Sequence, residues 1–142
     1  YGAHFAQVRI HEPTGEIRLD RMLGMFSAGR IINPRTARSQ FVGGMTMGVG
    51  MALHEKGELD PRFGHVVNQD LAEYHVPVNA DIRGIEAHWL DEEDPQAGPL
   101  GARGIGEIGI VGAAAAIANA AHHATGLRVR DLPVFGDAFL PQ

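Results

Sequence analysis

Two long apolar segments, rich in glycine and alanine, constrain the fold of this chain more than any other feature. A helix is expected over residues 34–54, because Asn33 is a favourable N-cap and Pro34 a favourable first helical residue. A second helix is expected over residues 107–125, with Gly126 as its C-terminal glycine. Both are apolar almost all round, which is typical of helices buried on every side. Four glycines of the first helix each cost about 1 kcal/mol relative to alanine, so we expect them to permit close backbone packing: Gly43, Gly44, Gly48 and Gly50.

Short strand-like segments surround the two helices. Residues 4–10 and 16–26 are separated by a turn-forming His-Glu-Pro-Thr-Gly sequence, which predicts a β-hairpin. Further strands are expected over residues 71–76, 85–90 and 127–134, and loops over residues 55–69 and 91–106. The strands are expected to be mostly antiparallel. The sequence therefore predicts an α+β fold, in one domain or part of one.

Composition excludes several classes of function. The net charge of −5 argues against a nucleic-acid surface. The absence of cysteine rules out disulfides, thiolate zinc sites and iron–sulfur ligation within the chain. The longest apolar run, residues 108–118, is shorter than the roughly 20 residues that cross a membrane. The eight histidines form no metal-binding motif, so no metal ligand is expected, and residues 91–94 (DEED) are expected as a solvated loop rather than a calcium site.

A glycine-rich stretch precedes the second helix. Residues 104–109 (GIGEIG) have the GxGxxG spacing of a dinucleotide-binding fingerprint, and Asp131 follows about where the Rossmann fold holds a ribose. That fingerprint must directly follow a buried strand, whereas here it follows a loop rich in proline and glycine. We therefore expect a loop that presents backbone N–H groups and Arg103 to an anion, with Glu107 as a candidate general base. The plainer alternative is that Glu107 caps its helix and Arg103 pairs with a surface acid.

The start of the first helix carries similar chemistry. Two arginines and the free amides of a helix N-terminus suit a pyrophosphate, and Gln40 follows one turn later. Ordinary capping with solvated arginines is the alternative. Because two buried helices begin with this chemistry, an extended ligand with phosphates could span both of them. The polar residues at this start are Arg30, Asn33, Arg35 and Thr36.

Three segments of the chain resemble a known family. They read ARSQFVGGMTMGVGMALHE, NQDLAEYHVPVNADI and GARGIGEIGIVGAAAAIANAAHHATGLRVRDLPV. They are similar to the C-terminal part of the molybdenum-binding large subunit of the xanthine dehydrogenase and aldehyde oxidase family, nearest to bacterial aldehyde oxidoreductases that use molybdopterin cytosine dinucleotide. The resemblance covers essentially the whole chain. It implies that residues 1–142 are the C-terminal portion of a molybdopterin-binding domain and a fragment of a longer subunit.

The resemblance implies a role for each matching residue. Glu107 falls where the family keeps its active-site glutamate, the base that activates a hydroxyl on molybdenum. Many relatives carry lysine at the position of Arg103, which keeps the charge. The residue after the glutamate, Ile108, departs from many xanthine-type members and favours aldehydes. The residues implied to contact the cofactor are Arg30, Ile31, Ile32, Asn33, Pro34, Arg35, Thr36, Gln40, Arg103, Gly104, Ile105 and Gly106.

The implied activity is oxidation of aldehydes, or related N-heterocycles, to acids with water as the oxygen source. Electrons would then pass to iron–sulfur clusters and FAD in partner chains or domains, since this chain has no cysteine. Two alternatives stay open: a free-standing dinucleotide-binding module that uses the GxGxxG loop, and a structural fragment that is inert alone. The compartment, cytoplasmic or periplasmic, is not fixed by the sequence.

Overall fold

A long hairpin forms the base of the structure. In the computed structural model, which describes residues 1–140, β1 (Gly2–His11) pairs antiparallel with β2 (Glu16–Phe26), and the register shifts between Gln7 and Val8. β5 (Ile85–Trp89) joins the other edge of β2 and runs parallel to it. The predicted hairpin is confirmed. The parallel pairing of β5 is the exception to the antiparallel expectation, and it requires the long crossover that α1 provides.

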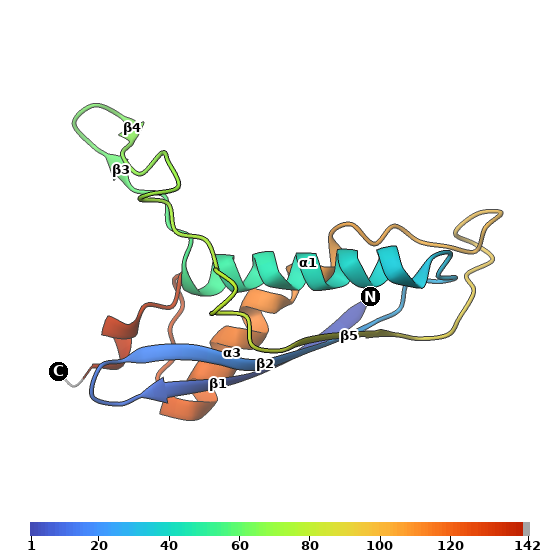
Figure 1. The fold of residues 1–142 in the computed structure, drawn as a ribbon, viewed down its shortest axis with the longest axis horizontal. Coiled ribbons are helices and arrows are strands. Elements are labelled where there is room, and N and C mark those ends of the chain that lie inside the picture. The colour runs from blue at the N-terminus through green and yellow to red at the C-terminus, as the bar shows by residue number, and fades with distance from the viewer. Residues whose placement is uncertain (141–142) are drawn as a thin grey trace.

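The helices pack against this sheet and against one another (Figure 1). α1 (Pro34–Leu53) starts at the predicted residue. The second predicted helix is divided at Gly112 into α2 (Ile108–Val111) and α3 (Ala113–Thr125), so a continuous helix over residues 107–125 was wrong. The division has a visible cause, because the His4 ring lies against Gly112 and its Nε2 is 3.1 Å from the carbonyl oxygen of Gly109. Gly126 has a φ of 77° and ends α3 as predicted.

The core fills the space between the sheet and α1. Phe26 of β2 and Phe41 of α1 are both fully buried, and their rings stack with centroids 4.3 Å apart. Met22, Met45 and Ile117 are also fully buried. A second, smaller cluster joins α3 to the 3-10 helix η1 (Gly136–Phe139) near the C-terminal end of the described chain. Ile10 and Ile17 pack against this second cluster, so it ties the C-terminal part of the described chain to the hairpin.

The close packing predicted for the four glycines of α1 is clearest at Gly44 and Gly48. A Cβ built at Gly44 would lie 3.0 Å from the backbone of Gly109, and one at Gly48 would overlap the Cβ of Ala113. At Gly50 a Cβ would lie 3.0 Å from a carbon of Pro77. Gly43 faces open space, with nothing within 4 Å, so the packing explanation was wrong there.

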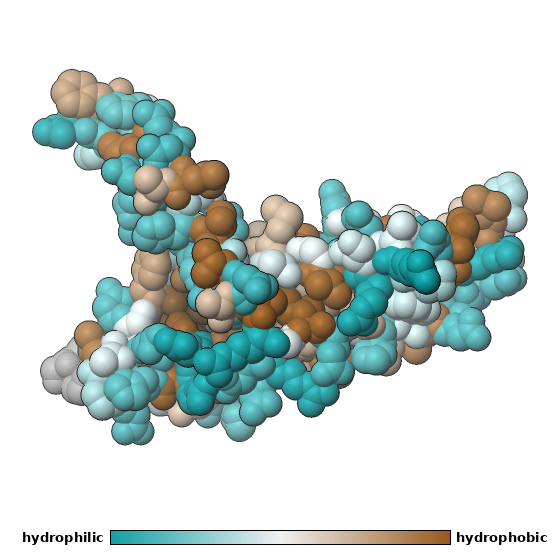
Figure 2. All heavy atoms as spheres, viewed as in Figure 1, coloured by the Kyte–Doolittle hydropathy of each residue, from teal (hydrophilic) through white to brown (hydrophobic). Residues whose placement is uncertain are grey.

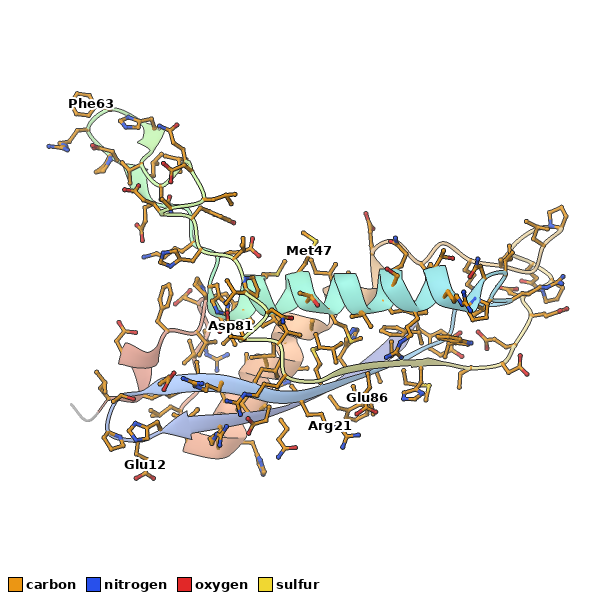
Figure 3. All side chains as sticks on the ribbon, viewed as in Figure 1. Glu12, Arg21, Met47, Phe63, Asp81 and Glu86 are labelled. Atoms are coloured by element: carbon orange, nitrogen blue, oxygen red, sulfur yellow. The ribbon has the colours of Figure 1, made fainter. Side chains whose placement is uncertain are left out.

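One side of α1 is exposed, contrary to the expectation of burial all round. The side chain of Met47 points away from the body in Figure 3 and is 62% exposed, and Met51 is 45% exposed. On α2, Val111 is 73% exposed. These helices therefore carry more apolar side chains than residues 1–140 cover. Within residues 1–140, no helix has the length and apolar content needed to cross a bilayer.

Two of the predicted strands do not form. Residues 71–76 are turns and irregular backbone, and residues 127–134 are irregular. Neither segment reaches a free sheet edge, and Leu71 is 82% exposed. The predicted loop 55–69 contains a short hairpin, in which the two-residue strands β3 (Leu59–Asp60) and β4 (His65–Val66) pair antiparallel. This hairpin lies on an arm that projects from the body, with Phe63 near its tip (Figures 1 and 3).

Candidate functional site

The two segments predicted to bind a cofactor lie side by side. An isolated β-bridge joins Gly29 to Ala102, the N–H of Arg30 donates to the carbonyl of Gly101 (2.8 Å), and the N–H of Arg103 donates to the carbonyl of Ala28 (3.0 Å). The loop of residues 91–106 therefore passes close to the N-terminal end of α1 (Figure 1). Residues more than 70 positions apart in the sequence therefore meet here, a contact that the sequence alone does not specify.

A groove of about 250 Å³ opens between these two segments. Seven of the residues predicted to contact a cofactor line it, together with Ala37 and Ala102. The lining is mixed, with apolar walls and two guanidinium groups, which suits a ligand with both a ring system and an anionic group. The seven predicted residues are Arg30, Ile31, Ile32, Asn33, Thr36, Arg103 and Ile105.

The other predicted residues lie around this groove without lining it. Pro34 begins α1 and lines a neighbouring hollow, and Arg35 and Gln40 are exposed on α1. Gly104 and Gly106 belong to the loop that carries Ile105. Contact between any of these residues and a cofactor stays a prediction.

The helix N-terminus offers arginine side chains rather than free amides. The Asn33 side chain accepts hydrogen bonds from the N–H groups of Arg35 (3.0 Å) and Thr36 (3.2 Å), so the expectation of free amides there was wrong. This is ordinary N-capping. The side chains of Arg30 and Arg35 are exposed and form no ion pair with any residue in the described part of the chain. The available positive charge at this end therefore comes from their guanidinium groups.

Arg103 is already paired. Its Nε donates to Asp94 at 2.7 Å, its Nη1 donates to the Ser27 hydroxyl at 3.0 Å, and Nη1 is 4.0 Å from Glu92. Hydrogen bonding to Asp94 raises the pKa of Arg103, and the same bond lowers the pKa of Asp94. The alternative in which Arg103 pairs with an acid is thus what the structure shows. Its guanidinium is held in place rather than free.

The loop that leads to Glu107 is open. Among residues 1–140, no backbone acceptor or side chain binds the N–H groups of Gly104, Ile105 or Gly106. A Cβ at Gly104 or Gly106 would meet nothing within 4 Å, and neither glycine has a positive φ. Nothing inside the described chain requires glycine here. The loop instead leaves space for another group to approach its free N–H groups.

Glu107 occupies the N-cap position of α2 but does not cap it. Its side chain is exposed and makes no hydrogen bond to the helix, so the capping alternative was wrong for this residue. α2 has only four residues, which makes the helix dipole at Glu107 weaker than expected for a long helix. The carboxylate is left free to act on a ligand. No strand leads directly into the GxGxxG stretch, because β5 ends at Trp89 and residues 90–107 form no further strand, so the context that a Rossmann fingerprint needs is missing.

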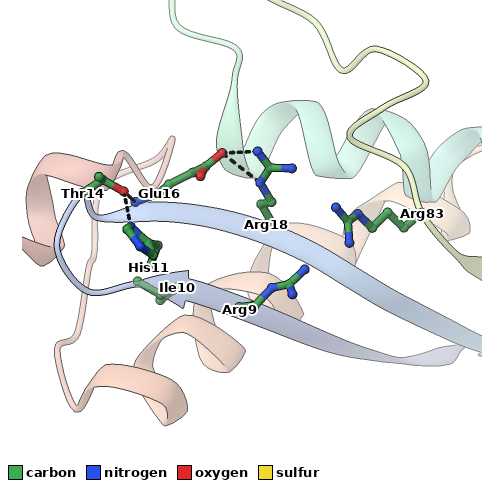
Figure 4. Close-up of a pocket in the computed structure, with 7 residues that line it drawn as sticks. All are labelled: Arg9, Ile10, His11, Thr14, Glu16, Arg18 and Arg83. Atoms are coloured by element: carbon green, nitrogen blue, oxygen red, sulfur yellow. Dashed lines mark hydrogen bonds and ion pairs between the residues drawn. The ribbon is translucent and has the colours of Figure 1, made fainter.

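A larger hollow at the hairpin end contains none of the predicted site residues. It has a volume of about 470 Å³ and three arginines face it (Figure 4). Arg18 is bound to Glu16, and Arg9 to Asp20 at 2.9 Å. Since these arginines are already neutralised by carboxylates, this hollow is a poor candidate for an anion site. No three histidine or carboxylate side chains gather to hold a metal ion anywhere in residues 1–140.

Three residues of the site were missed from the sequence. Ser27 was given no role, and Glu92 and Asp94 were placed in a solvated acidic loop. Both acids instead turn toward Arg103, and the Ser27 hydroxyl donates to Glu92. That hydrogen bond, with a second from the N–H of Gly29, lowers the pKa of Glu92. The acidic run beside an arginine-containing loop was the only available signal.

Comparison with solved structures defines the class to which this fold belongs. The aldehyde oxidoreductase of Desulfovibrio desulfuricans superposes with a TM-score of 0.88 and 30% identity, over 99% of this chain and 15% of that one. The aldehyde oxidoreductase of Desulfovibrio gigas superposes with a TM-score of 0.87, also at 30% identity, over 99% of this chain and 15% of that one. The fold is thus that of a segment of molybdenum hydroxylases.

Sequence comparison gives the family. A model of the molybdopterin cofactor-binding domain matches residues 1–83. The aldehyde oxidoreductase molybdenum-binding subunit PaoC of Escherichia coli (strain K12) is 52% identical over 140 residues, which are 99% of this chain and 19% of that subunit. The probable hypoxanthine oxidase XdhD of the same organism is 39% identical over 92% of this chain and 14% of its own length. The chain belongs to the molybdopterin cofactor-binding domain family, and it spans about a fifth or less of these relatives.

Proposed function

We propose that residues 1–142 are the C-terminal portion of a molybdopterin-binding domain, in a molybdenum hydroxylase that oxidises aldehydes or related N-heterocycles to acids. The observation that carries the proposal is the open loop of residues 104–107 beside the arginine-lined groove. Resemblance to relatives named as aldehyde oxidoreductases supports the choice of aldehydes. The alternative of a free-standing dinucleotide module loses its support, because no strand leads into the GxGxxG loop.

The residues fit a pterin dinucleotide. A pyrophosphate needs positive charge and N–H donors, and the guanidinium groups of Arg30 and Arg35 form no ion pair within residues 1–140. Ile31, Ile32 and Ile105 supply an apolar wall. The N–H groups of residues 104–106 have no acceptor in residues 1–140, and a Cβ at Gly104 or Gly106 would meet nothing within 4 Å. We propose the cytosine form of the dinucleotide on resemblance to bacterial aldehyde oxidoreductases.

Glu107 is the proposed base. When bound, the molybdenum cofactor supplies a redox centre that accepts electrons from the substrate carbon. Glu107 would take a proton at its carboxylate, and its exposed side chain has no hydrogen bond to α2 that would have to break first. Gly106, directly before Glu107, carries no side chain, and a Cβ at that position would meet nothing within 4 Å, so the chain leaves space next to the carboxylate. A positioned base of this kind contributes roughly 10²–10⁴-fold in rate.

The chain requires partners for the full reaction. It has no cysteine to hold iron–sulfur clusters, so these would be carried by other chains or domains, and FAD beyond them is proposed on the family resemblance. A 34% identical relative is named as subunit gamma of the 6-hydroxypseudooxynicotine dehydrogenase complex of Paenarthrobacter nicotinovorans, which is a subunit of a larger assembly. A segment that is inactive on its own is compatible with such an assembly, because the electrons taken from the substrate must pass to an acceptor outside this chain.

The direct test is Glu107→Gln in the assembly that purifies with this chain. We expect turnover to fall at least about 10²-fold, as for a lost general base, with the molybdenum content nearly unchanged. Glu12→Gln, an equal change in the exposed hairpin turn, is the control and should leave turnover as it was. Normal turnover in Glu107→Gln would contradict the assignment. A parallel loss of molybdenum would show that Glu107 serves binding instead.

A further inference from the structure

Ser27 sits at the centre of a hydrogen-bonded network that the reaction scheme does not use. Ser27 directly follows β2 in the sequence, and it is only 2% exposed. Its Oγ accepts a hydrogen bond from Nη1 of Arg103 and donates one to Oε1 of Glu92. Because a guanidinium can only donate, the single proton of Ser27 has to point toward Glu92. We call Ser27, Glu92, Asp94 and Arg103 the Arg103 network.

The Arg103 network joins the two walls of the candidate cofactor groove. Oε1 of Glu92 also accepts from the N–H of Gly29 at 3.2 Å, one residue before Arg30. Apart from the network, the walls are held directly by one isolated β-bridge and its two backbone hydrogen bonds. A pair of segments with so few direct bonds depends on side chains for its geometry. The network lies at that bridge, where it can set the distance between the walls.

The network also sets the charge that faces the groove. Arg103 is balanced by Asp94 at 2.7 Å and by Glu92 at 4.0 Å, whereas Arg30 has no carboxylate partner in residues 1–140. An anionic ligand in the groove would therefore be attracted mainly to Arg30 rather than to Arg103. The two arginines of the groove would therefore have different roles. Arg30 would attract the anionic ligand, whereas Arg103 would help to hold the two walls together.

We propose that Glu92 is a positioning residue of the cofactor site, acting through Ser27 and Gly29 to hold residues 28–30 against residues 101–103. The proposal rests on the proposed function, since it concerns the groove assigned there to the cofactor. Glu92 touches no reacting group itself. Its removal should loosen the loop that carries Ile105 and Glu107 and let the cofactor dissociate faster.

The test uses the assembly that purifies with this chain and three variants. Glu92→Ala removes the acceptor. Glu92→Gln keeps an oxygen that can accept from Ser27 and Gly29. Glu93→Ala is the matched control, because the Glu93 side chain is exposed and makes no hydrogen bond in the described part of the chain. We expect nucleotide dissociation to accelerate about 10-fold or more in Glu92→Ala, the usual scale for supporting residues around a metal centre. Glu92→Gln should restore most of the retention, and Glu93→Ala should match the unmodified protein.

A second readout keeps the proposal separate from the proposed function. Limited proteolysis of the loop of residues 91–106 should be faster in Glu92→Ala than in Glu93→Ala, whether or not a cofactor is present. If the unmodified assembly holds neither molybdenum nor nucleotide, the proposed function fails and proteolysis alone decides the network. If Glu92→Ala does not fold, Ser27→Ala takes its place with the same expectations. Unchanged dissociation and unchanged proteolysis in the variant used would overturn the positioning role.

Discussion

His4, near the start of β1, joins the hairpin to the junction of α2 and α3 through one ring. Its Nε2 lies 3.1 Å from the carbonyl oxygen of Gly109, and the ring lies against Gly112, where the helical segment divides into α2 and α3. The ring also packs edge-on against Phe26, with centroids 5.3 Å apart. Burial of the ring lowers the pKa of His4, and the hydrogen bond to Gly109 offsets part of that effect. The folded protein therefore prefers the neutral ring.

This preference predicts a pH dependence of stability. The ordinary pKa of histidine is 6.5, and the folded value is lower, so the unfolded chain binds the proton more tightly. The stabilising contribution is present above about pH 6.5 and is lost as the pH falls through the lowered pKa of His4. Urea unfolding at pH 7.5 and pH 5 should show this loss. His4→Gln should remove part of the dependence, whereas His123→Gln, at an exposed position on α3, should leave it unchanged.

The helices of this molecule are placed by contacts that only glycine permits. The backbones of α1 and α2 approach so closely that a Cβ at Gly44 would be 3.0 Å from Gly109, and a Cβ at Gly48 would overlap that of Ala113 on α3. This approach fixes the position of α2 against α1, and with it the loop that carries Glu107. Gly43 lies on the same helix as Gly44 and Gly48, but a Cβ there would face open space.

The two kinds of glycine should respond to alanine in opposite directions. Gly48→Ala adds a methyl group where no room exists, so it should lower the free energy of unfolding by about 1–3 kcal/mol, as overpacking does. Gly43→Ala should raise it by up to about 1 kcal/mol, because alanine has the better helix propensity. Urea denaturation of both variants measures the difference. Equal effects at the two positions would contradict close packing as the reason for Gly48.

Elements whose signals are local were predicted well, and contacts between distant residues were not. Asn33 and Pro34 predicted the start of α1, and Gly126 predicted the end of α3. The break at Gly112 depends on His4, whose partner Gly109 is 105 residues away in sequence, and no local pattern signals it. The site shows the same division. The sequence pointed to the glycine loop and Arg30, whose contact with a cofactor stays a prediction, whereas the pairing of Ser27 with Glu92 spans 65 residues and was missed.

As a whole, the molecule leaves a large apolar surface uncovered. Exposed apolar residues follow one side of α1 and the arm of residues 55–80, and Figure 2 shows apolar surface over both. Patches of this kind mark surfaces that bind other protein. The relatives that it matches are five or more times as long, since the chain spans 19% of one and 14% of another. The expectation that α1 is buried all round was wrong for the described chain, and its exposed side is consistent with the proposal of a longer subunit.

The central claim is that this chain encloses part of a molybdenum cofactor. The most direct test is to purify the assembly that contains it from its native source, and to measure molybdenum per chain together with the nucleotide released by mild acid. We predict molybdenum and cytidine monophosphate in comparable amounts. An assembly that contains neither molybdenum nor this nucleotide, and that binds NAD tightly instead, would contradict the account and return the GxGxxG loop to the role that its context argues against.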